Sequence, residues 1–154
     1  MTTIDTLATI EAQLRPAAEA ICIAEHRPVC WIPRAVPWRG KGINARNTGY
    51  VILIGEGAIN KLPVDELAFA VAHEIGHAIN QSTDESDADA TAVRIVYGAG
   101  FDPLAGVALM HRLATPVTTL AWLTGGFLHY PSQGERARRI EALVASDAKP
   151  RVNQ

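Results

Sequence analysis

The sequence predicts an α+β fold that is mostly helical and has a small sheet in its first half. Two observations lead to this fold class. Apolar residues recur at helical spacing in most segments, and short apolar runs next to glycine or proline occur between residues 28 and 54. The 154 residues, 48% of them hydrophobic, suit one domain with one core. We expect that domain to span residues 1–145 and a polar, flexible tail to follow at 146–154.

The first half of the chain contains one predicted helix and two predicted strands. Residues 4–25 carry an apolar stripe at helical spacing, which Pro16 is expected to kink or divide. Residues 28–33 are a short strand candidate. Residues 34–46 contain Pro, Gly and Asn and are expected to form a loop. The strongest strand pattern covers residues 50–54, which lie between two glycines.

The second half is predicted to be helical throughout. The expected helices cover residues 63–80, 85–97, 103–113, 115–127 and 132–144. Pro63 and Pro103 occupy first helical positions, where the missing N–H costs nothing. Gly98 and Gly100 end the second of these helices. Residues 81–84 form the turn before it.

Composition limits the function classes. The formal net charge of −2 indicates neither a nucleic-acid partner nor binding to an anionic membrane. No segment reaches the roughly 18 apolar residues of a membrane span. The nearest stretch, residues 117–128, is interrupted by threonine and glycine, so we expect a buried helix or a lid over a cleft. Cys22 and Cys30 are the only cysteines and no secretory signal precedes them, so a cytoplasmic location is expected and their pairing stays open.

The most informative motif is His73-Glu74-Ile75-Gly76-His77, inside a predicted helix. Residues four apart lie on one helical face, so His73 and His77 can direct two imidazoles at one metal ion. Glu74 lies beside them and can reach a water molecule bound to that metal. Two histidines and a general base in this spacing are typical of catalytic zinc sites. The alternative is a chance match on an ordinary amphipathic helix.

A catalytic zinc ion needs a third protein ligand and one open position. Glu85 and Asp89 are again four residues apart, on the next predicted helix. We expect Glu85 to bind the metal and Asp89 to accept the free ring N–H of a ligating histidine. Asp84, Asp87 and Asp89 itself are the competing ligands, and an acidic, solvated helix start is the alternative without metal.

An ordered series of segments extends this pattern from Ile43 to Leu143. The segments are Asn44-Ala45 with the strand after it, Asp65-Glu66-Leu67-Ala68, Val71 to His77, Ala99-Gly100-Phe101-Asp102-Pro103, and Pro131 with Glu135-Arg136. This series resembles the gluzincin metallopeptidases and, more narrowly, the HtpX-type and CAAX prenyl endopeptidase family. The chain resembles a minimal form of it, without the family's usual transmembrane helices. Only seven residues separate His77 from Glu85, and Tyr130 replaces the family's histidine.

The resemblance implies a zincin-like fold whose edge strand flanks the helix with the two histidines. It also implies an endopeptidase with one zinc ion per chain and Glu74 as general base. An extended polypeptide substrate would pair with the exposed sheet edge beside the metal. That edge is expected at Tyr50, Val51, Ile52, Leu53 and Ile54, with a central core strand as the alternative. His129, Tyr130 and Arg136 are three candidates for stabilising the oxyanion.

Two functional hypotheses follow. The first is a zinc-dependent endopeptidase. The second is a non-enzymatic or latent zinc-containing domain with a binding or regulatory role on the same fold. Glu74 favours the enzyme, since a structural zinc site needs no base and usually closes its fourth position with cysteine.

Overall fold

The computed structural model of the protein describes residues 3–114 and 132–147. The elements in chain order are α1 (Thr3–Ala24), β1 (Arg34–Trp38), β2 (Ala45–Asn47), β3 (Val51–Gly55), α2 (Glu56–Lys61), α3 (Val64–Asn80), α4 (Glu85–Gly98), α5 (Ala105–Leu113) and α7 (Gln133–Asp147). The fold is therefore α+β and mostly helical with a small three-stranded sheet, as the sequence predicted.

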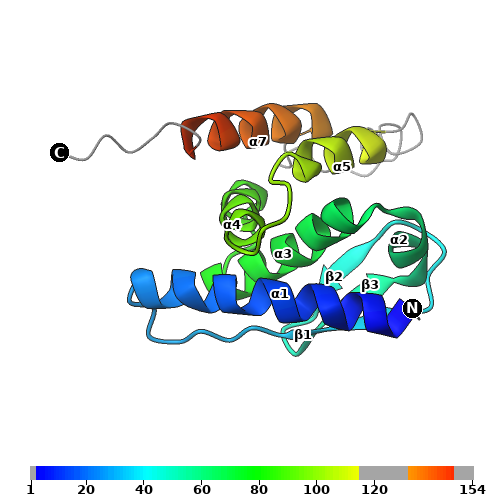
Figure 1. Ribbon diagram of the computed structural model, residues 1–154, viewed down its shortest axis with the longest axis horizontal. Coiled ribbons are helices and arrows are strands. Elements are labelled where there is room, and N and C mark those ends of the chain that lie inside the picture. Colours follow the sequence, from blue (N-terminus) through cyan, green and yellow to red (C-terminus); the bar gives the residue numbers. More distant parts are fainter. Residues whose placement is uncertain (1–2, 115–131, 148–154) are drawn as a thin grey trace.

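The helices and the sheet are stacked in three levels. Figure 1 shows α1 and the sheet at the bottom, α3 and α4 in the middle, and α5 beside α7 at the top. Each level contributes fully buried side chains to one continuous core. They include Leu7, Leu14, Ile52, Ile54, Phe69, Ile75, Ile95 and Ile140. This core fixes α3 and α4 against each other near the centre of the molecule.

The order of strands in the sheet is β1-β3-β2. β3 pairs in parallel with β1 and antiparallel with β2. The expectation that residues 50–54 form an exposed edge is therefore wrong, because β3 is the central strand. Tyr50 is 84% exposed and lies just before this strand. The apolar run is unbroken because both faces of β3 are covered, one fully at Ile52 and Ile54 and the other partly at Val51 and Leu53.

Other differences from the sequence prediction also occur in the first half of the chain. β1 lies within the expected loop at 34–46, β2 begins at the end of that loop, and residues 28–33 form no strand. Pro37 is tolerated in β1 because β1 is an edge strand. α1 runs through Pro16 without being divided. The predicted helix at 115–127 and the apolar stretch at 117–128 lie outside the described residues.

α7 begins and ends close to the predicted positions. The hydroxyl of Ser132 accepts a hydrogen bond from Glu135 N, and the Glu135 carboxylate accepts one from Ser132 N. This reciprocal pair is a capping box. The helix continues to Asp147, three residues past the expected end, so the first part of the expected tail is helical.

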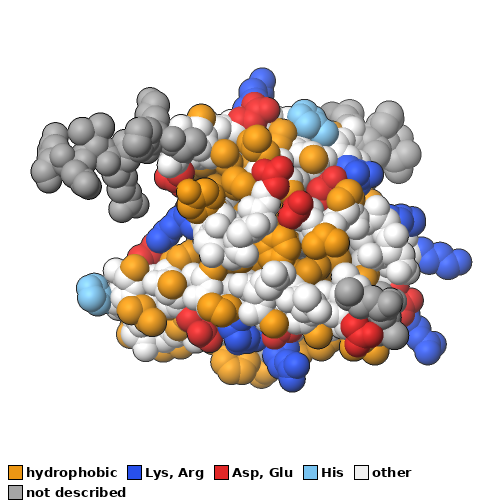
Figure 2. Space-filling view, viewed as in Figure 1, with side chains coloured by type: hydrophobic (Ala, Val, Ile, Leu, Met, Phe, Trp, Pro, Cys, Tyr) orange, Lys and Arg blue, Asp and Glu red, His pale blue; other side chains and the backbone are white. Residues whose placement is uncertain are grey.

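The surface carries charges of both signs. On the face shown in Figure 2, Lys and Arg side chains are interspersed with Asp and Glu. None of the helices in the described part of the chain has the length and apolarity that a membrane crossing requires. Cys22 and Cys30, whose pairing the sequence left open, form a disulfide.

Candidate metal centre

α3 carries His73 and His77 one turn apart on the face that packs against α4. The two helices approach closely at Gly76. A Cβ atom at this position would lie 2.9 Å from the Ala88 carbonyl oxygen and 3.2 Å from Ala88 Cα. A larger residue would therefore push α4 away. The glycine between the two histidines is what allows α4 to lie close enough to contribute a ligand.

A short turn brings the start of α4 back to the two histidines. α3 ends at Asn80, and the capping residue Gln81 adopts a left-handed conformation with φ of 50°. The carbonyl of Ser82 accepts a hydrogen bond from His77 Nδ1 at 2.8 Å, which fixes the ring of that histidine. Asp84 then caps α4 by accepting a hydrogen bond from Asp87 N. Glu85, the first residue of α4, consequently faces the two imidazoles despite the short spacing.

Three potential ligand groups converge at this point. His73 Nε2 and His77 Nε2 are 3.1 Å apart. Glu85 Oε2 lies 3.4 Å from His73 Nε2, and Glu85 Oε1 lies 3.2 Å from His77 Nε2. Metal–ligand bonds of 2.0–2.1 Å in a tetrahedral zinc site separate neighbouring ligand atoms by about 3.3–3.4 Å. These three residues can thus hold a metal ion, and their spacing fits a small tetrahedral cation.

Without metal, Glu85 and the two histidines stabilise each other's charged forms, although His73 opposes protonation of His77. Burial opposes protonation of His73, but hydrogen bonds with Asp89 and Glu85 outweigh it and raise the pKa of the ring to about 9. Burial likewise opposes ionisation of Glu85, yet hydrogen bonds with both histidines hold the pKa of this carboxyl well below its usual range. A metal ion must displace the proton on His73, because only the neutral imidazole is a ligand.

Asp89 and Arg136 lie behind the ligands and hold them in place. Asp89 is 2% exposed, and its Oδ1 lies 2.9 Å from His73 Nδ1. Because a carboxylate only accepts hydrogen bonds, Nδ1 of His73 carries the proton and Nε2 faces the ligand cluster. Arg136 of α7 donates to both oxygens of Asp89, at 2.8 and 2.7 Å. It also lies 3.1 Å from Glu85 Oε2.

Replacing Asp89 with Asn should weaken metal binding by about 10- to 100-fold without changing the number of ligands. The amide has no charge to stabilise His73, and its NH₂ group cannot accept a hydrogen bond from Arg136. The measurement is a zinc competition titration with a chromogenic chelator. Asp87→Asn is the matched control, because Asp87 is exposed on the same helix and lies outside the ligand cluster. Equal affinities for the two variants would contradict this role of Asp89.

Glu74 connects the cluster to the sheet. Its Oε2 accepts a hydrogen bond of 2.8 Å from the backbone N–H of Asn47, the last residue of β2. Glu74 also lines two cavities next to the ligands. One of about 310 Å³ has mainly apolar walls, and the other, of about 520 Å³, is more polar and includes Ser82 and Thr83. Glu74 therefore lies where the two cavities meet at the cluster.

The structure brings together some of the predicted site residues and not others. His73, Glu74, His77, Glu85, Asp89 and Arg136 meet in one place. The competing ligands Asp84 and Asp87 lie outside the cluster of ligand atoms. The guanidinium of Arg136 is held by Asp89 and Glu85. His129 and Tyr130 lie outside the described residues.

Two further contributors, Asn47 and Ser82, are not indicated by any sequence pattern. Both act through the backbone, Asn47 by its N–H group and Ser82 by its carbonyl, so no side-chain pattern marks them.

Comparison with protein families, with curated proteins and with solved structures found no match to this chain. The resemblance to gluzincin metallopeptidases accordingly stays a prediction.

Proposed function

We propose that this protein is a zinc-dependent endopeptidase of the gluzincin type, with His73, His77 and Glu85 as the zinc ligands. The observation that carries the proposal is the convergence of three ligand groups at tetrahedral spacing, with the carboxylate of Glu74 beside them. Three protein ligands leave a fourth position for a water molecule. A purely structural site has no use for an adjacent base.

Glu74 acts as the general base and proton carrier in this proposal. A zinc ion held by His73, His77 and Glu85 would supply Lewis acidity for the scissile carbonyl and would lower the pKa of water toward about 7. Glu74 takes the proton of the attacking water and passes it to the leaving nitrogen. The Asn47 N–H group donates to Glu74 Oε2 and so limits the orientations of the carboxylate. One oxygen, Oε1, remains for proton transfer.

β2 provides the sheet edge for an extended substrate, in place of the strand that the sequence suggested. Gly55 N donates to Asn44 O, and Thr48 N donates to Val51 O. Hydrogen-bonded pairs alternate in an antiparallel ladder, so the backbone groups of Ala45 and Asn47 point away from β3. Asn47 N–H is bonded to Glu74, so this edge lies directly beside the proposed catalytic base and offers a peptide its other outward groups, the N–H and C=O of Ala45 and the C=O of Asn47. An extended peptide can add to it by backbone hydrogen bonds.

The cavity of about 310 Å³ supports binding of an apolar side chain next to the scissile bond. Leu62, Phe69, Leu109, Met110 and Leu113 line it, together with His73 and Glu74. A salt bridge between Glu66 of α3 and Arg112 of α5 joins the two helices that supply most of these apolar residues. The absence of a side chain at Gly106 lets α5 contact the Phe69 ring, because a Cβ atom there would lie 2.4 Å from a ring carbon.

Filling this cavity should change substrate preference. Ala70 lines the cavity one turn before Glu74, so Ala70→Leu narrows it without touching a proposed ligand. We expect kcat/KM for peptides with Phe or Leu beside the cleaved bond to fall about 10-fold or more relative to peptides with Ala there. Ala12→Leu, on the exposed side of α1, is the matched control. Unchanged relative kcat/KM values in Ala70→Leu would rule out this use of the cavity.

Digestion of casein and of a peptide library tests the proposed function. The protein is stripped with a chelator, assayed, reloaded with one equivalent of zinc and assayed again, with products identified by mass spectrometry. We expect cleavage only in the zinc-loaded protein. Zinc binding without cleavage under all conditions would favour the alternative, a non-enzymatic zinc-containing domain with a binding or regulatory role.

A further inference from the structure

The disulfide between Cys22 and Cys30 closes a short loop at the end of α1. The chain reverses direction in this loop, where His26 adopts a φ of 51° and Arg27 N donates to Cys22 O. Cys22 is buried in the last turns of α1, whereas Cys30 is exposed. We call residues 22–30 the disulfide loop. Its side chains reach the two helices that carry the metal ligands.

Arg27 connects the disulfide loop to the C-terminal end of α3. Its guanidinium donates to the carbonyl oxygen of Ile79 and, at 2.9 Å, to Oδ1 of Asn80. Carbonyls in the last turn of a helix have no partner within the helix, so a cation from outside stabilises that turn. Ile79 and Asn80 lie two and three residues after His77. Arg27 therefore fixes the end of the helix that positions this ligand.

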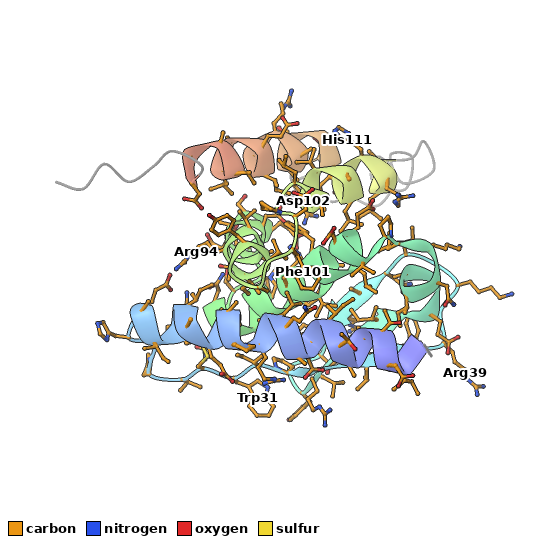
Figure 3. All side chains as sticks on the ribbon, in the orientation of Figure 1. Trp31, Arg39, Arg94, Phe101, Asp102 and His111 are labelled. Atoms are coloured by element: carbon orange, nitrogen blue, oxygen red, sulfur yellow. A yellow bond between two sulfur atoms is a disulfide. The ribbon has the colours of Figure 1, made fainter. Side chains whose placement is uncertain are left out.

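The same contacts continue to α4. Asn80 Nδ2 donates to Thr91 Oγ1 at 2.9 Å and to the Asp87 carbonyl at 3.2 Å. Within the loop, Glu25 binds Arg27 and also forms a salt bridge with Arg94 of α4. In Figure 3, Arg94 extends from α4 toward the end of α1. The disulfide loop thus contacts α3 directly and α4 by two routes.

The turn between α3 and α4 is held weakly by its own backbone. Gln81 N to Ala78 O and Ser82 N to His77 O are both 3.3 Å, long for backbone hydrogen bonds. Gln81 also has the left-handed conformation that disfavours a side chain. Yet this turn carries the Ser82 carbonyl that orients His77 and leads directly to Glu85. The turn is therefore supported by the contacts at its two ends, where Arg27 holds the end of α3 and Asn80 joins that end to α4.

We propose that the disulfide loop is a redox-sensitive clamp on the metal centre, with Arg27 as the positioning residue that connects the two. This inference rests on the proposed zinc site.

An external dithiol reduces the disulfide of the clamp. One thiolate of the dithiol attacks the sulfur of exposed Cys30, and the Cys22 thiolate leaves and takes up a proton. The second thiolate of the dithiol then displaces Cys30, which is also protonated, and the dithiol becomes a disulfide.

Reduction frees the loop, weakens the contact of Arg27 with the end of α3, and loosens the turn between the ligand helices. Two measurements on oxidised and reduced wild-type protein test this series of effects. Hydrogen exchange of the metal-free protein reports on the amides of Gln81 and Ser82. A chelator competition, with a phosphine as the reductant because thiols bind zinc, gives the zinc affinity. Reduction should speed exchange of these two amides and lower zinc affinity by at least about 10-fold.

Arg27→Gln tests whether Arg27 transmits the effect. With the disulfide intact, this variant should show the fast amide exchange and weak zinc binding of the reduced wild type. Reducing Arg27→Gln should change both quantities little further, because the two perturbations act through one contact. Arg15→Gln is the matched control, since Arg15 also donates to a backbone carbonyl, that of Ile32, and its other hydrogen bond is to Glu11 of α1.

Each outcome decides a defined part of the proposal. Unchanged exchange at Gln81 and Ser82 after reduction overturns the clamp. Faster exchange with unchanged zinc affinity overturns its link to the metal. If reduction speeds amide exchange throughout the chain, the whole fold has been destabilised. The comparison of the disulfide-intact Arg27→Gln variant with oxidised wild type then decides whether Arg27 holds the turn. If no form binds zinc, the proposed function fails, and the exchange data still decide whether the loop clamps the two helices.

Discussion

Replacing Glu74 with Gln should lower kcat by about 100- to 10,000-fold while leaving zinc content unchanged, because general-base catalysis contributes an effect of this size. Gln has nearly the same shape, and its carbonyl oxygen can still accept the hydrogen bond from Asn47 N. It cannot take up a proton from water. The measurement is steady-state cleavage of a fluorogenic peptide selected from the library digest, together with metal analysis of the same samples.

Glu19→Gln is the control for this substitution, since Glu19 is exposed on α1 and far along the chain from the cluster. It should retain wild-type kcat. Equal turnover by the wild type and the Glu74→Gln variant would indicate a contaminating protease and leave the enzymatic proposal without support. A large loss of zinc from Glu74→Gln would instead show that Glu74 helps to hold the metal.

Replacing His77 with Ala should weaken zinc binding by roughly 100- to 1000-fold. Structural zinc sites bind their ion with roughly 10–16 kcal/mol from four ligands, which is about 2.5–4 kcal/mol for each ligand. The substitution also removes the ring that the Ser82 carbonyl orients. Chelator competition gives the affinity, and elemental analysis gives the stoichiometry.

His111→Ala provides the control, because His111 is an exposed residue of α5 and points outward from the molecule in Figure 3. It should keep full zinc stoichiometry and wild-type affinity. Full stoichiometry with unchanged affinity in the His77→Ala variant would contradict the ligand assignment. Loss of zinc from both variants would point to global destabilisation.

The parts of the site that the sequence predicted are those encoded by local spacing. His73 and His77 share a helix face by periodicity alone, and Glu85 with Asp89 repeats this pattern on the next helix. The close packing that joins the two pairs depends on Gly76 and on the turn at Gln81. Both residues can be read from the sequence, but the close approach of α3 and α4 that they allow can be seen only in the folded structure.

The parts that the sequence missed depend on contacts between distant segments. Strand neighbours follow from tertiary pairing, so the central position of β3 was not readable from its apolar run. β2 is short and polar, with Arg46 and Asn47 in it, and shows no alternating pattern. Bonds from Asn47 to Glu74 and from Arg136 to Asp89 join residues 27 and 47 positions apart. No local rule predicts either bond.

X-ray absorption at the zinc K-edge of the zinc-loaded wild-type protein tests the central claim most directly. His73, His77 and Glu85 predict one zinc ion per chain, coordinated only by nitrogen and oxygen at about 2.0–2.2 Å, with two imidazoles among the ligands. A sulfur ligand at about 2.3 Å would place the ion away from these three residues and contradict the assignment. Failure of the protein to take up stoichiometric zinc would contradict it equally.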